Sequence, residues 1–329
     1  MSTHQELHDS AVVIDGLIIS DWNRQVFEDM RRGGITAANC TCSVWEGFRE
    51  TTANIAQWKA WFEEHADVIT QVHVARDIER AKTEGRVGII LGWQNTSGIE
   101  DRLSFVRLFR DLGVRVMQLT YNTQNLVGSG CMESRDSGLS DFGRDLIDEM
   151  NRCGVLIDLS HVGPKTSEDA IRYSKKPVTF THCGPYALLA HPRNKTDDAF
   201  RLIAKHGGFV GVTTYPPFLS ADAASSLDDA VAAIEHVMNI VGEDAVGIGT
   251  DFTQGQSAAW FDWLCHDKGN GRRIVERTWD VAPFPKDLGS LADFPNVTAA
   301  MMRRGWDESR TRKVLGENWL RLLGEVWGE

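Results

Sequence analysis

Short apolar runs alternate with segments of helical periodicity along the chain, and this alternation limits its possible folds more than any other feature. Runs that are apolar at nearly every position are typical of strands buried on both faces of a parallel sheet. Glycine follows the last periodic residue of most helical segments, where a left-handed residue ends a helix. Eight strands are predicted in this way: Val12–Ile19, Ile35–Val44, Val87–Asn95, Val114–Thr120, Val155–His161, Val178–His182, Phe209–Thr214 and Val246–Phe252.

Eight strands separated by helices indicate an α/β fold of the (β/α)8, or TIM-type barrel, class. An open doubly wound sheet also alternates, but it normally has five or six strands and a G-x-G-x-x-G fingerprint after the first, which Val12–Ile19 lacks. No linker, repeat or low-complexity tract divides the chain. We therefore expect residues 1–329 to form one barrel domain.

The segment after the last predicted strand has a different composition. Residues 253–289 are rich in Gly, Trp, Pro and charge, which predicts a long loop. Because barrel active sites lie at the carboxyl ends of the strands, this loop is well placed to act as a lid. Its tryptophans, Trp260, Trp263 and Trp279, could equally pack on the barrel rim. Residues 290–329 are predicted to form C-terminal helices.

Charge and hydropathy narrow the classes of partner. The chain has 46 Asp plus Glu against 35 Lys plus Arg, a formal net charge of −11, and no basic run longer than Arg303–Arg304. This balance argues against nucleic acid or an anionic membrane and favours a small-molecule partner. No stretch resembles a transmembrane helix or a signal peptide, so we expect a cytoplasmic protein. Six scattered cysteines without a CxxC pair argue against a disulfide framework.

Ionisable side chains end three of the predicted strands. His161 ends the fifth, His182 ends the sixth, and Asp251 lies at the end of the eighth. Strand ends of a barrel meet at its mouth. Two neutral imidazoles can bind one divalent cation, and a carboxylate can complete the site or accept a proton from water. The three residues therefore predict a metal or acid–base centre, although either histidine alone could be a buried structural imidazole.

Other polar groups are expected near the same mouth. Gln94 lies at the end of the third strand, and Tyr121 and Asn122 follow the fourth, where they can donate hydrogen bonds to a substrate carbonyl or oxyanion. Arg193, in the loop after the sixth strand, is predicted to bind an anionic substrate group by a bidentate contact, with Asn194 beside it. The alternative is an ordinary surface arginine.

The motifs around these residues resemble the renal (membrane) dipeptidase family, peptidase family M19, of the amidohydrolase-like barrels. The resemblance spans nearly the whole chain and is carried by Val13–Gly16, Gly138–Gly143, Asn151–His161, Thr181–His182, Arg193–Asn194, Val246–Phe252 and Glu317–Leu320. It implies a (β/α)8 barrel and a homodimer. It also implies a site for two cations, usually zinc, that hydrolyses dipeptides and often tolerates a D-residue at the C-terminal position.

The resemblance assigns roles to four residues by position. His161 and His182 match the two histidine ligands of one cation. Arg193 matches the arginine that holds the substrate carboxylate, and Asp251 the aspartate that handles the proton.

The chain departs from the family pattern at the other cation. Where relatives have His-x-Asp after the first Asp-Gly, this chain has Leu17 and Ile19. The glutamate that bridges the cations is Gln94, and the histidine that polarises the scissile carbonyl is Tyr121. Because a neutral amide does not offset the charge of two dications, we expect no binuclear site and at most one zinc ion.

The sequence thus predicts a dipeptidase-like amidohydrolase that acts on an amide of a small carboxylate-bearing substrate. His161 and His182 would hold the metal, completed by Gln94, Asp251 or water, and Tyr121 and Gln94 would stabilise the oxyanion. Two alternatives stay open. One is a metal-independent lyase, isomerase or decarboxylase that uses the same groups. The other is a ligand-binding protein without activity.

Overall fold

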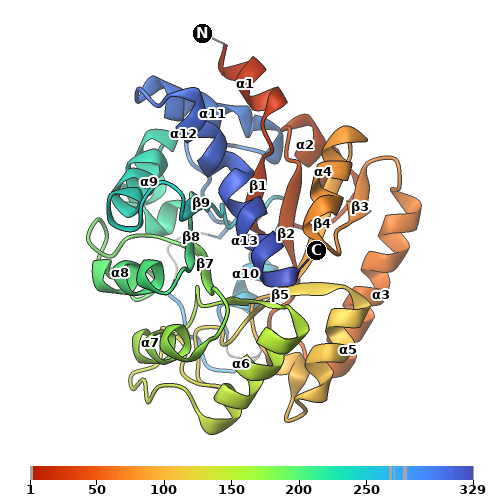
Figure 1. Cartoon of the computed structure of the whole chain (residues 1–329), viewed down its shortest axis with the longest axis vertical. Coiled ribbons are helices and arrows are strands. Elements are labelled where there is room, and N and C mark those ends of the chain that lie inside the picture. The colour runs from red at the N-terminus through yellow and green to blue at the C-terminus, as the bar shows by residue number, and fades with distance from the viewer. Residues whose placement is uncertain (1–2, 267–268, 270, 277–279, 329) are drawn as a thin grey trace.

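Parallel strands form a closed barrel at the centre of the molecule (Figure 1). The computed structural model describes residues 3–266, 269, 271–276 and 280–328. Its strands are β1 (Ile14–Ile18), β2 (Ala37–Ser43), β3 (Ile69–Gln71), β4 (Val87–Trp93), β5 (Val114–Gln118), β6 (Leu156–Asp158), β7 (Thr179–Cys183), β8 (Phe209–Val212) and β9 (Val246–Ile248). β2 pairs directly with β4, and β9 pairs with β1, so that eight strands close the barrel. The predicted fold class is confirmed.

β3 is a strand that the apolar pattern does not predict. It pairs with the first residues of β4, while Leu91–Trp93 at the other end of β4 pair with β5. With only three residues, of which Thr70 and Gln71 are polar, β3 is too short to show a strand period.

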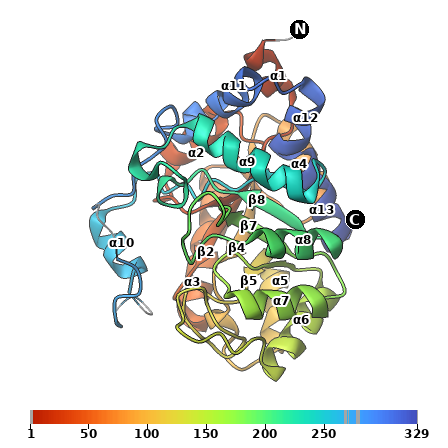
Figure 2. The ribbon, with the colours of Figure 1, turned by 90° about the vertical axis from the view of Figure 1, so that its left-hand side faces the viewer.

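Helices surround the barrel, most of them on its outside and some at its ends (Figures 1 and 2). They are α1 (His4–Ser10), α2 (Arg24–Arg32), α3 (Phe48–Glu64), α4 (Ala75–Thr83), α5 (Ser104–Leu112), α6 (Asp141–Cys153), α7 (Pro164–Tyr173), α8 (Asp197–Lys205), α9 (Leu227–Val241), α10 (Ala258–Leu264), α11 (Pro295–Arg303), α12 (Glu308–Arg312) and α13 (Asn318–Trp327). The predicted glycine ends are confirmed at Gly113 and Gly154, which take left-handed conformations after α5 and α6. No helix of the described residues is both long and apolar enough to cross a membrane.

The segment predicted as a loop contains helix α10. The Ser257 side chain caps it by accepting a hydrogen bond from the Trp260 amide. Its seven residues are too few to show a helical period in the sequence. Trp279, which falls in the same predicted loop, lies outside the described residues.

The interior of the barrel is closed at its amino-terminal end by α13. Trp319 of this helix packs among interior residues of the strands and donates a hydrogen bond from Nε1 to the Ile248 carbonyl at 2.9 Å. A Cβ added to Gly16, Gly211 or Gly247 would lie within 3 Å of the indole, so these glycines make room for it. Figure 2 shows α10 and α13 at opposite ends of the barrel, which leaves the α10 end for a site.

Candidate active site

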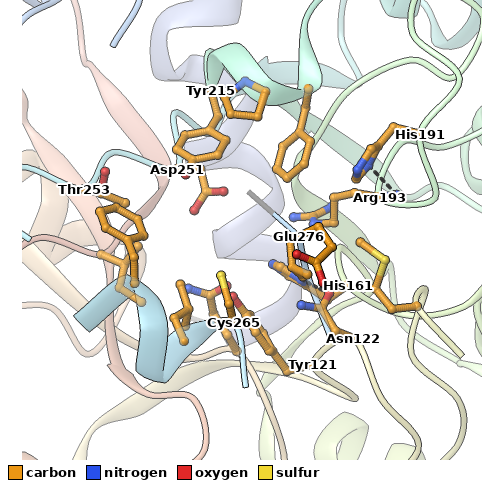
Figure 3. Close-up of a pocket in the computed structure, with 18 residues that line it drawn as sticks. Tyr121, Asn122, His161, His191, Arg193, Tyr215, Asp251, Thr253, Cys265 and Glu276 are labelled. Carbon is orange, nitrogen blue, oxygen red and sulfur yellow. Dashed lines mark hydrogen bonds between the residues drawn. The ribbon is translucent and has the colours of Figure 1, made fainter. Parts of the chain in front are cut away.

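A cavity of about 110 Å³ opens at the carboxyl ends of the strands (Figure 3). Six of the predicted site residues line it: Gln94, Tyr121, Asn122, His161, Arg193 and Asp251. They follow four different strands and one loop of the chain, so it is closure of the barrel that brings them together. His182 is fully buried against His161, and Asn194 is not among the described lining residues.

The two histidines face each other. His161 Nε2 and His182 Nε2 lie 3.2 Å apart. On the far side of each ring, His161 Nδ1 lies 2.8 Å from Asn122 Oδ1, and His182 Nδ1 lies 2.7 Å from Thr181 Oγ1. Thr181 donates its own hydroxyl hydrogen to Asp158, so its oxygen accepts from His182. This network assigns the Nδ1–H tautomer to both rings and leaves two Nε2 lone pairs directed at each other.

Both imidazoles are neutral. Burial lowers the pKa of His161 and of His182 well below 6.5, and the charges of Arg193 and Lys195 lower both further. Two nitrogens bound to one cation at 2.0–2.1 Å in tetrahedral geometry lie roughly 3.3 Å apart. The histidine pair therefore fits two ligands of a single metal ion.

Two buried aspartates hold the residues that carry the chemistry. Asp158 of β6 accepts hydrogen bonds from the Thr181 amide (3.0 Å) and hydroxyl (2.7 Å). Asp15 of β1 accepts the equivalent pair from Thr250, at 2.8 and 2.5 Å. Each threonine immediately precedes a predicted site residue on the neighbouring strand. Burial raises the pKa of both carboxyls, that of Asp15 to about 7.

Asp251 directs its carboxylate into the cavity (Figure 3). Its backbone has φ +60°, a left-handed conformation that Asp and Asn tolerate better than most residues. The residue is 9% exposed, and burial raises its pKa to about 6 against the opposing effect of Arg193. A carboxylate of this pKa can take up and release a proton near neutral pH.

Arg193 is a buried residue of the cavity wall rather than a surface arginine. Its Nη1 donates to the Ser160 carbonyl and its Nη2 to the His182 carbonyl, both at 2.7 Å. Its Nε has no hydrogen-bond partner in the described part of the chain. Asn194 does not line the cavity. Its side-chain amide donates to the carbonyls of Leu189 and Phe218 and so stabilises the surrounding loop.

Gln94 and Tyr121 occupy positions where the resemblance implied a bridging carboxylate and an imidazole. Gln94 Nε2 donates to Thr41 Oγ1 at 3.1 Å, and its buried Oε1 has no hydrogen-bond partner among the described residues. The Tyr121 ring stacks on His161 with centroids 4.1 Å apart. Burial and the charge of Asp251 raise the Tyr121 pKa well above 10, so its hydroxyl stays protonated.

Apolar side chains occupy the first-strand positions that the resemblance assigns to the other cation. Leu17 and Ile19 are buried in one cluster with Val44, Trp45 and Tyr121. Among the residues the structure describes, no group of three or more His, Cys, Asp and Glu side chains is placed to hold a metal ion. The geometry thus offers the histidine pair as the core of a single cation site and no second set of ligands in that part of the chain.

Several lining residues escape prediction from the sequence. Tyr215 and Phe218 come from the loop after β8, and Phe261 comes from α10. Glu276 follows α10 and brings a carboxylate to the wall of the cavity (Figure 3). Tyr215 directly follows the predicted strand Phe209–Thr214, so the rule that identified Tyr121 could have found it. Phe261 and Glu276 fall in the predicted loop 253–289, but nothing in its sequence singles them out.

Comparison with known proteins gives matches over most of the chain. Residues 21–264 match the family described as membrane dipeptidase (peptidase family M19). The crystal structure of an amidohydrolase from Pseudomonas aeruginosa is 52% identical over 100% of both chains, with a TM-score of 0.98.

More distant structures share the fold. A metallo peptidase from Rhodobacter sphaeroides, liganded with a phosphinate mimic of the dipeptide L-Ala-D-Ala, is 22% identical over 96% of this chain and 99% of its own, with a TM-score of 0.80. A probable dipeptidase from Pseudomonas aeruginosa is 20% identical over 98% and 97%, with a TM-score of 0.82.

Proposed function

Because the chain belongs to the membrane dipeptidase family, peptidase family M19, we propose that it hydrolyses an amide bond of a small carboxylate-bearing substrate with at most one metal ion. The observation that carries this proposal is the pair of Nε2 lone pairs of His161 and His182, 3.2 Å apart and each fixed from the far side of its ring. A dipeptide or an amino-acid derivative is the proposed substrate class.

His161 and His182 would hold the cation, and Gln94 Oε1, Asp251 or water would complete its ligands. When bound, a divalent cation such as zinc supplies Lewis acidity, which polarises a carbonyl and lowers the pKa of water. The Oε1 of Gln94 suits a neutral ligand, because it is buried and has no hydrogen-bond partner in the part of the chain that the structure describes. The apolar cluster around Leu17 and Ile19 supports one ion rather than two.

The other lining residues supply the remaining functions. Asp251 is ionised at neutral pH, so it accepts the proton of the attacking water and returns it to the leaving amine. The protonated Tyr121 hydroxyl donates a hydrogen bond to the developing oxyanion, with Gln94 as the neighbouring amide. The Nε–H of Arg193 donates a hydrogen bond to the substrate carboxylate, while its two Nη atoms donate to backbone carbonyls of the cavity wall.

Zinc content and hydrolysis together test this proposal. Protein purified without added metal and after zinc loading should hold about one zinc per chain, and the His161→Ala/His182→Ala variant should hold none. A panel of L,L and L,D dipeptides and N-acyl amino acids should contain a substrate that the wild type hydrolyses and Asp251→Asn does not. Two zinc ions per chain would contradict the interpretation of Leu17 and Ile19.

A metal-independent reaction is the second candidate, because the two neutral imidazoles and Asp251 form an acid–base set without a cation. Absence of zinc from both wild-type preparations, with turnover that resists a chelator, would favour a lyase, isomerase or decarboxylase. Saturable binding of a ligand without turnover would favour a binding protein.

A further inference from the structure

A second cavity, of about 330 Å³, lies beside the candidate active site and has no part in the proposed reaction. Ile19 lines both cavities. Helix α10 also borders both, because it places Phe261 and Leu264 on the first and Trp260 and Trp263 on the second. The two cavities are therefore adjacent, with Ile19 and helix α10 between them.

Five tryptophans line the second cavity: Trp22, Trp58, Trp61, Trp260 and Trp263. Trp58 stands edge-on to Trp22 and to Trp61, with ring centroids 5.1 and 5.0 Å apart. The α10 pair is tilted, with centroids 6.4 Å apart. Indole rings carry electron-rich faces, and such faces attract organic cations.

The charges of the second cavity have one sign. Asp21 and Glu46 line it, and no Lys, Arg or His is among its described lining residues. Glu46 is held in place, because its carboxylate accepts hydrogen bonds from the Val44 amide (2.7 Å) and from Asn54 Nδ2 (3.2 Å). Within the described ranges, neither carboxylate forms a salt bridge with a cationic side chain. Two carboxylates that have no cationic partner among the described residues, in a cavity lined by indoles, are complementary to a positively charged ligand.

We propose that the second cavity binds an organic cation, an alkylammonium group that belongs to the substrate. A neutral aromatic ligand would use the tryptophans but not the two carboxylates. A metal ion would use the carboxylates but not five indole rings. An alkylammonium group uses both, through cation–π contacts and charge attraction. Its assignment to the substrate rests on the proposed hydrolysis, whereas cation binding itself does not.

Direct binding tests the cation site. Tetramethylammonium chloride is titrated at constant ionic strength while tryptophan fluorescence is followed, with tert-butanol as the neutral probe of similar shape. We expect saturable quenching by the cation and at least about tenfold weaker binding of tert-butanol. The Asp21→Asn/Glu46→Gln variant should bind the cation about tenfold more weakly. Asp9→Asn/Glu79→Gln, which removes two exposed charges from α1 and α4, should bind as the wild type does.

Equal affinity for the two probes, or equal weakening in both double variants, would overturn the cation site. Substrate preference is the second measurement. Amides that carry a trimethylammonium group are compared with tert-butyl analogues, and kcat/KM should favour the cation about tenfold in the wild type and not in Asp21→Asn/Glu46→Gln. Hydrolysis that shows no preference for the cationic amide, by a protein that does not bind the cation selectively, would refute the inference and leave the proposed function intact. Selective cation binding without any hydrolysis would leave the cation site standing and would refute the proposed function, together with the assignment of the cation to the substrate.

Discussion

Replacement of Asp251 by Asn should stabilise the protein at alkaline pH while it abolishes turnover. The folded state shifts the pKa of this carboxyl from the ordinary 3.8 to about 6, mainly through burial. A raised pKa means that the protonated form favours folding. Its stabilising contribution is fully present below about pH 3.8 and is lost as the pH rises through about 6.

The size of the effect follows from the same values. At 1.36 kcal/mol per pH unit, keeping Asp251 ionised in the folded state costs about 3 kcal/mol at pH 8 and roughly half of that at pH 5. The neutral amide avoids this cost, and Asn accepts the backbone φ of +60° as readily as Asp. With an unfolding entropy of about 2.1 cal/mol/K per residue, 3 kcal/mol corresponds to an increase in Tm of about 4 °C.

Urea denaturation of the wild type and of Asp251→Asn at pH 5, 6.5 and 8 measures this difference. Asp9→Asn, which removes an exposed carboxylate on α1, is the control and should change the free energy of unfolding by less than about 0.5 kcal/mol at each pH. An Asp251→Asn variant that is no more stable than the wild type at pH 8 would refute the raised pKa of Asp251. A stabilisation that does not shrink toward pH 5 would refute it equally.

Three further predictions concern the same site. The wild-type rate should fall as the pH drops through about 6, because Asp251 then becomes protonated; a pH–rate profile flat between pH 5 and 7 would contradict its role as the base. Thr181→Val should weaken zinc binding about 10–100-fold in a chelator competition, because a ligand imidazole loses the acceptor that orients it. Thr179→Val, which removes a hydroxyl of the same strand that donates only to the Phe209 carbonyl of β8, should leave zinc affinity unchanged; equal losses would argue against the tautomer assignment. Arg193→Lys should lower the free energy of unfolding by about 1–3 kcal/mol in urea, because one ammonium group cannot reach both wall carbonyls, and wild-type stability would disprove the structural part of its role.

The sequence predicts the barrel because a strand buried on both faces is recognisable from a short run of apolar residues. Val87–Asn95 and Val114–Thr120 are apolar along most of their length, and strand ends identify His161 and Asp251 as residues of the mouth. β3 lies below the length at which a period can be recognised.

The finer geometry of the site depends on contacts between distant parts of the chain. Nothing in the sequence around Arg193 shows that its guanidinium binds two backbone carbonyls of the wall. The bond from Thr250 to Asp15 joins residues that are 235 positions apart in the sequence. The tryptophans of the second cavity come from separate segments, so their common wall exists only after folding.

Trp319 makes completion of the barrel core a late event in the synthesis of this protein. Ribosomes synthesise the chain from its amino terminus, so all the strands of the barrel leave the ribosome before this indole does. Until then, the space beside Gly16, Gly211 and Gly247 has no side chain to fill it. A nascent chain that already carries every catalytic group therefore still lacks the core residue that closes the barrel, and the native site can become fully stable only when synthesis has passed α13.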